Sequence, residues 1–157
     1  MIRSILLVCT GNSCRSAMAE GLLRKLLRER GCKEIKIFSA GIAAVPGMMA
    51  SANAIEVMAK EGADISNHRS SSVTKELIKQ ADLVLCMEPL HLQAVLNFDL
   101  EAKDKTYLLL DYAYEMEEDK PANFYVTDPV GKPLEVYESV LMTLREAMER
   151  LVKRICV

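Results

Sequence analysis

The sequence predicts an α/β protein with three layers: a four-stranded parallel sheet, doubly wound, with helices on both faces. Short apolar runs, typical of strands buried on both faces, alternate along the chain with longer amphipathic stretches. The 157 residues are 50% hydrophobic and contain no internal repeat or low-complexity segment, so we expect a single domain over residues 1–157.

The individual elements follow from these patterns in chain order. Strands are expected at residues 3–9, 35–39, 81–87 and 106–110. Helices are expected at residues 14–30, 48–60, 74–80, 89–96 and 133–154. Residues 111–132 are predicted to be a long non-helical segment, which a compact domain usually keeps only as a functional loop.

Composition limits the partners and the compartment. A net charge of -2 gives no electrostatic reason to expect nucleic acid or a membrane surface as a partner. No apolar run approaches the length of a membrane span and no signal peptide is recognisable, so a cytoplasmic location is expected. The five cysteines lack the paired spacings of a zinc site or a disulfide framework; reduced thiols and no metal or cofactor are predicted. The sequence defines no oligomeric state.

The stretch VCTGNSCRS, residues 8–16, lies between the first predicted strand and the first predicted helix. In open α/β sheets, ligands bind outside the carboxyl ends of the strands at this kind of position. Successive N–H groups of such a turn, together with the helix N-terminus, favour a tetrahedral anion. The pattern is neither a Walker loop nor a dinucleotide fingerprint. The sequence therefore predicts a phosphate-binding loop made of Thr10, Gly11, Asn12, Ser13, Cys14 and Arg15.

This loop also carries a nucleophile. A thiol at a helix N-terminus beside a cation has a lowered pKa, so Cys9 is expected to react as a thiolate. The planar fork of Arg15 can hold two oxygens of a phosphoryl group and stabilise the charge that spreads over them during transfer. The pair predicts phosphoryl transfer to sulfur.

Several segments together resemble the low-molecular-weight protein tyrosine phosphatase family over essentially the whole chain. They are CTGNSCRS followed by AMAEG, then SAG at 39–41, VTKELIKQADLVLCME and the late TDP. The resemblance implies a protein phosphatase acting on phosphorylated proteins, with Cys9 as nucleophile, Arg15 as phosphate ligand and Asp128 as general acid. It also implies that Asn12, Ser16, Ser39 and His68 hold the loop by hydrogen bonds.

Physical arguments support two of these roles. Asp128 precedes Pro129 inside the long loop, and one carboxyl can protonate the leaving atom and later accept a proton from the attacking water. Ser16 can donate a hydrogen bond to the thiolate, although it is equally suited to cap the helix. His68 is interpreted as structural, and His91 is expected to be exposed and without a role.

Two alternatives to the phosphatase remain. A thioredoxin-linked arsenate reductase needs two further redox cysteines after the third strand, where only Cys86 occurs. A redox-sensing phosphate-binding module would use Cys9 and Cys14 as a pair. In the phosphatase reading, Cys14 is a candidate to capture oxidised Cys9 as a disulfide, which makes Cys9 a redox-sensitive cysteine.

The resemblance implies that the substrate is phosphoarginine or phosphotyrosine. Ser13 and the small DPVG turn resemble the protein-arginine phosphatases of bacteria, whereas the tyrosine branch usually has a bulky apolar residue at position 13. Four aromatic residues of the long segment either wall a substrate ring or pack into the core: Tyr112, Tyr114, Phe124 and Tyr125.

Overall fold

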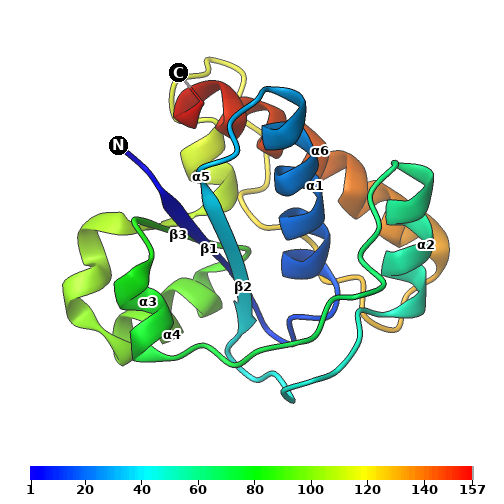
Figure 1. Cartoon of the computed structure of the whole chain (residues 1–157), viewed down its shortest axis with the longest axis horizontal. Helices are drawn as coiled ribbons and strands as arrows, with labels where there is room; N and C mark the ends of the chain where they lie inside the picture. Colours follow the sequence, from blue (N-terminus) through cyan, green and yellow to red (C-terminus); the bar gives the residue numbers. More distant parts are fainter. Residues whose placement is uncertain (157) are drawn as a thin grey trace.

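A parallel sheet of four strands runs through the middle of the protein in a computed structural model, which describes residues 1–156 (Figure 1). The strands are β1 (Ser4–Cys9), β2 (Lys36–Gly41), β3 (Leu83–Cys86) and β4 (Thr106–Leu108), in the order β2-β1-β3-β4. All neighbouring strands pair in parallel. The predicted fold class is therefore confirmed.

Helices cover both faces of the sheet and form the outer two layers (Figure 1). One face carries α1 (Arg15–Glu29), α2 (Ala52–Lys60), α5 (Leu109–Ala113) and α6 (Leu134–Ile155). The other carries α3 (Lys75–Gln80), α4 (Pro89–Phe98) and the 3-10 helix η1 (Leu100–Lys105). Side chains of β1 alternate between the two cores: Ile5 and Leu7 pack under α1 and α6, while Leu6 and Val8 pack under α3 and α4.

The largest difference from the predicted elements follows β4. The strand expected at 106–110 ends at Leu108. A helix, α5, begins at Leu109 and extends into residues 111–132, which were expected to be non-helical. Leu109, Leu110 and Ala113 are buried in the core that includes α6, and this spacing gives a short helix one apolar face. The irregular segment that remains runs from Tyr114 to Pro133.

The expectation that all cysteines are reduced is wrong for two of them. Cys32 and Cys156 form a disulfide with a Cα–Cα distance of 6.1 Å, and Cys9, Cys14 and Cys86 are free thiols. The bridge joins the segment after α1 to the end of α6, two helices that pack against each other. The two cysteines are 124 residues apart in the chain, so their contact depends on the tertiary fold and has no local signal.

The topology brings several polar residues to one edge of the sheet. β1 ends at Cys9 and β3 ends at Cys86, and because both strands run in parallel their following loops lie at the same edge. Residues 10–14 of the predicted phosphate loop connect β1 to α1 at this edge, the last residue of that loop, Arg15, begins α1, and Glu88 follows β3. Within residues 1–156, none of the helices combines the length and the apolar character needed to cross a bilayer.

Candidate active site

The carbonyl groups of the loop after β1 are bound by the protein around it. Four of them accept hydrogen bonds: Cys9 from Ile42 N–H (3.0 Å), Thr10 from Ala43 N–H (2.9 Å), Asn12 from His68 Nε2 (2.6 Å) and Ser13 from Ser51 N–H (2.9 Å). The N–H group of Asn12 donates to Cys9 Sγ at 3.3 Å. The N–H groups of Gly11, Ser13, Cys14 and Arg15 have no acceptor within residues 1–156. This is the donor arrangement that binds a tetrahedral anion.

Two backbone features shape the loop. Asn12 adopts a left-handed conformation with φ 54°, which asparagine tolerates better than most residues. Gly41, at the end of β2, lies against the loop so closely that a Cβ there would collide with the carbonyl oxygen of Thr10 and lie 3.0 Å from Asn12 N. The glycine of the SAG segment is therefore required by this close approach of two backbones.

A buried hydrogen-bond chain reaches Cys9 from behind the loop. Ser39 Oγ donates to the carboxylate of Glu20 (2.5 Å), which also accepts from Arg24 Nε (3.0 Å). Because the hydroxyl proton of Ser39 is used in this way, Ser39 accepts from Asn12 Nδ2 (2.9 Å). The second hydrogen of Asn12 Nδ2 is donated to Ser16 Oγ (2.7 Å).

The direction of this chain determines what Ser16 does. Its oxygen accepts from Asn12, so its own proton is donated to Cys9 Sγ at 2.9 Å. A donated hydrogen bond favours the thiolate form of the cysteine. Glu20, a residue that sequence reasoning missed, fixes this direction because a carboxylate accepts and does not donate.

Arg15, the first residue of α1, is 2% exposed and lies beside the loop. Its Nη1 donates to Glu88 Oε2 (2.5 Å) and to the carbonyl of Val126 (3.0 Å). Its Nη2 lies 3.5 Å from Thr10 Oγ1 and 3.5 Å from Asp128 Oδ2. The structure therefore brings Arg15 and Asp128 together across 113 positions of sequence.

Asp128 is held at the mouth of the site. Its side chain is 46% exposed, and its Oδ1 accepts from Val130 N–H at 3.1 Å, which fixes the carboxyl next to Pro129. A carboxyl group placed between solvent and a guanidinium can exchange protons with water and with a group bound beside that guanidinium.

The expectation that His91 is exposed is wrong: its side chain is 0% exposed. Its Nδ1 accepts from Glu88 N–H (3.1 Å), and its Nε2 lies 2.8 Å from Thr10 Oγ1. Burial, and secondly the charge of Arg15, lowers the pKa of His91 to about 4. The segment MEPLH contained a local signal for the capping role of position 91, since Glu88 caps α4 and Pro89 is its first residue, but no signal for the contact of His91 with Thr10.

Comparison with known proteins agrees with this geometry. Residues 4–156 match the model of the low molecular weight phosphotyrosine protein phosphatase family. The chain belongs to this family. A probable low molecular weight protein-tyrosine-phosphatase, EpsP of Ralstonia nicotianae, is 38% identical over 99% of this chain and 97% of the relative. The protein-arginine-phosphatase of Bacillus subtilis is 34% identical over 96% of this chain and 95% of the relative.

A solved structure with the same fold contains a phosphorylated active-site serine. It is a variant of the arginine phosphatase YwlE, 31% identical, with a TM-score of 0.88 over 98% of this chain and 95% of that chain. The present phosphatase thus resembles both tyrosine and arginine phosphatases.

Cys14 lies on the other side of the phosphatase loop from the hydrogen bonds that link Ser39, Asn12 and Ser16. Its Sγ donates to Ser51 Oγ (3.3 Å) and lies 3.4 Å from Tyr137 OH on α6. The disulfide between Cys9 and Cys14 stays a prediction, because both are free thiols in this structure. In residues 1–156 no group of three His, Cys, Asp or Glu side chains is arranged to hold a metal ion.

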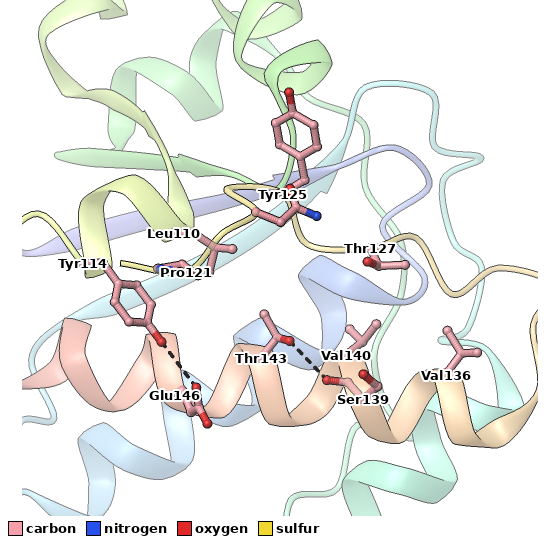
Figure 2. A pocket seen from close by; sticks show the side chains of 11 residues that line it. Leu110, Tyr114, Pro121, Tyr125, Thr127, Val136, Ser139, Val140, Thr143 and Glu146 are labelled. Atoms are coloured by element: carbon pink, nitrogen blue, oxygen red, sulfur yellow. Dashed lines mark hydrogen bonds between the residues drawn. The ribbon is translucent and has the colours of Figure 1, made fainter. Parts of the chain in front are cut away.

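A cavity of about 260 Å³ lies between the segment 121–127 and α6 (Figure 2). Tyr114 borders it, buried, with its hydroxyl donating to Glu146 at 3.4 Å. The ring of Tyr112 lies 3.9 Å from the guanidinium carbon of Arg154. Both tyrosines therefore pack against α6, whereas Tyr125, 48% exposed, points away from the cavity in Figure 2.

Proposed function

We propose that this phosphatase hydrolyses phosphorylated protein side chains through a phosphocysteine intermediate. Cys9 Sγ attacks phosphorus and the bond from phosphorus to the leaving atom breaks, while Asp128 gives that atom a proton. Water then attacks phosphorus, Asp128 takes the proton of the water, and the sulfur leaves as a thiolate with Ser16 donating to it. Arg15 and the loop N–H groups bind the phosphoryl oxygens.

One observation carries this proposal. Cys9 Sγ accepts from Asn12 N–H and Ser16 Oγ at the base of a loop whose other N–H groups lack acceptors in the described residues, with Arg15 and Asp128 paired beside it. The phosphorylated active-site serine of the YwlE variant supports covalent phosphorylation at the nucleophile's position.

Replacing the nucleophile tests the mechanism. We expect Cys9→Ser to lower kcat for a chromogenic aryl phosphate by about a thousandfold or more, because a serine hydroxyl is a far weaker nucleophile than a thiolate. Inorganic phosphate should still bind, as measured by calorimetry, and the circular dichroism spectrum should be unchanged. Hydrolysis at the wild-type rate by Cys9→Ser would contradict the phosphocysteine intermediate.

We further propose that the substrate is phosphoarginine. A phosphoguanidino group is polar and rich in N–H, so it gains from small polar neighbours and carboxylates, whereas phosphotyrosine gains from aromatic walls. Ser13 is small and partly exposed, and the carboxylates of Glu88 and Asp128 both lie within 3.5 Å of Arg15. Tyr112 and Tyr114 pack against α6, which leaves fewer aromatic residues for a phenol ring.

The substrate is tested by comparing kcat/KM on phosphoarginine and phosphotyrosine peptides for the wild type and Ser13→Ile. We expect the wild type to prefer phosphoarginine, and the substitution to shift the ratio of the two kcat/KM values towards phosphotyrosine by about tenfold, since the hydroxyl is replaced by apolar bulk. A wild type that prefers phosphotyrosine peptides would reject the substrate and leave the mechanism intact.

Arsenate reduction is less well supported than phosphatase activity. Cys86, the cysteine in the region of the third strand, is the last residue of β3 and is 0% exposed, and burial raises its pKa to about 12. A thiol in this environment is a poor relay group. For the redox-sensing alternative, the discriminating result is the absence of any phosphate ester hydrolysis by the reduced protein.

A further inference from the structure

His91 is a fully buried titratable residue that the proposed mechanism does not use, yet it touches the phosphate loop. It lies on α4, and its ring bridges the backbone at Glu88 and the side chain of Thr10. The charged groups around it are Arg15, Glu88 and Asp128. A buried ring with a defined partner at each nitrogen is held in one orientation.

The hydrogen-bond partners define the protonation of this ring. The Glu88 N–H group can only donate, so Nδ1 must be the unprotonated nitrogen that accepts at 3.1 Å. In a neutral imidazole the proton is then on Nε2, which donates to Thr10 Oγ1 at 2.8 Å. The lowered pKa of His91, about 4, agrees with a neutral ring at neutral pH.

The hydroxyl of Thr10 still has a hydrogen without an acceptor among the described residues once these hydrogen bonds are assigned. Its oxygen accepts from His91 Nε2 and, at 3.5 Å, from Arg15 Nη2. Its own hydrogen therefore has to be donated elsewhere, and no acceptor for it is found among residues 1–156. Arg15 Nη2 is also the atom that faces Asp128. A phosphoryl oxygen bound by Nη2 would lie within reach of the Thr10 hydroxyl.

We propose that Thr10 binds the substrate through its side chain, which donates its hydroxyl hydrogen to a phosphoryl oxygen, and that His91 is the positioning residue that sets this direction. The proposal rests on the proposed function, because it requires a phosphoryl group on Arg15. It predicts that a bound phosphoryl group accepts hydrogen bonds from two side chains, the guanidinium of Arg15 and the hydroxyl of Thr10, in addition to the loop N–H groups.

The experiment measures the affinity for inorganic phosphate by calorimetry, together with kcat and KM on an aryl phosphate. Thr10→Val keeps the branched shape and removes the hydroxyl, and we expect phosphate affinity to fall about tenfold, as for the loss of one hydrogen bond to a charged ligand. Thr10→Ser keeps the hydroxyl and should restore most of the affinity. His91→Asn places an amide oxygen near the position of Nδ1 but gives up the Nε2 donor, and it should weaken phosphate binding to a similar extent.

The double variant decides whether His91 acts through Thr10. We expect Thr10→Val with His91→Asn to bind phosphate no more weakly than Thr10→Val alone; losses that multiply to about a hundredfold would show independent roles and overturn the proposal. Wild-type affinity in Thr10→Val would also overturn it. Gln93→Ala, at an exposed position of α4, is the matched control and should bind as the wild type does.

Arg15→Ala separates this inference from the proposed function. If Arg15→Ala keeps its phosphate affinity, the loop is not the phosphate site and the proposed function fails. If Arg15→Ala loses affinity while Thr10→Val does not, only the assignment of Thr10 and His91 fails. Should His91→Asn not fold, the comparison of Thr10→Val with Thr10→Ser still decides the role of the hydroxyl.

Discussion

Two polar networks flank the loop after β1, and they differ in how completely their hydrogen bonds are filled. The loop-support network is formed by Glu20, Asn12, Ser16, Ser39 and His68. In it, every side-chain N–H and O–H of Asn12, Ser16 and Ser39 is donated to a protein atom. Asn12 and Ser16 are 0% exposed. A fully satisfied buried network holds one arrangement of its side chains, and the side chains of Asn12, Ser16 and Ser39 have no further donor to offer to a ligand.

The mouth network, formed by Thr10, Arg15, Glu88, His91 and Asp128, is open by comparison. Its two carboxylates are 33% and 46% exposed, and the hydroxyl hydrogen of Thr10 is not donated within the described residues. Under the proposed function, the closed network would act on the thiolate of Cys9, and the open network would contact the substrate. Substitutions in the two networks should therefore change different observables.

The largest effect is expected in the mouth network. Asp128→Asn should slow hydrolysis of an alkyl phosphate, a poor leaving group, by about a thousandfold, but that of an activated aryl phosphate far less, because a good leaving group needs little protonation. The measurement is the dependence of kcat/KM on the leaving group's pKa in wild type and variant. An equal loss for every leaving group would point to a damaged site rather than a missing acid.

An intermediate effect concerns stability. Since the pKa of His91 is lowered to about 4 in the folded state, the unfolded chain binds a proton to it between pH 6.5 and 4 and the folded chain does not. The stability that neutral His91 contributes is thus complete above pH 6.5 and is lost as the pH falls towards 4. This loss should amount to about 2 to 3 kcal/mol, with the burial of the ring limiting solvent screening.

Urea unfolding at pH 7 and pH 4.5 measures this contribution. The wild type should lose more unfolding free energy between the two pH values than His91→Asn, which has no imidazole to protonate. Identical losses of unfolding free energy in the two proteins would show that His91 is not the group responsible. They would also contradict the assignment of this pH dependence to the mouth network.

The smallest effect is expected in the loop-support network. Ser16→Ala removes a hydroxyl that donates to Cys9 Sγ, so alkylation of Cys9 by iodoacetamide at neutral pH should be slower and turnover should fall about tenfold. Phosphate affinity should change little, in contrast to Thr10→Val. If Ser16→Ala weakened phosphate binding as strongly as it slowed turnover, the two networks would not be separable.

The sequence was sufficient for the sheet, the main helices and the position of the loop, because apolar periodicity and the CTGNSCRS segment are local signals. It was insufficient where a role depends on distant contacts. Nothing near His91 shows that it packs beneath Thr10, 81 positions away, and Glu20 gains its importance only from the hydroxyl of Ser39 on β2. The helix α5 was missed because its apolar residues read equally well as the end of a strand.

The cavity behind the segment 121–127 affects how that segment opens. Opening a segment costs the contacts that it breaks, and this one has a hollow of about 260 Å³ on its inner side instead of a packed core. Its firm attachment is at Val126, which is 0% exposed and whose N–H donates to the carbonyl of Met87. Amide hydrogens of residues 122–124 should therefore exchange with deuterium well before that of Val126. Val126 is therefore expected to separate residues 122–124, which open locally, from the following residues, which keep Asp128 in place.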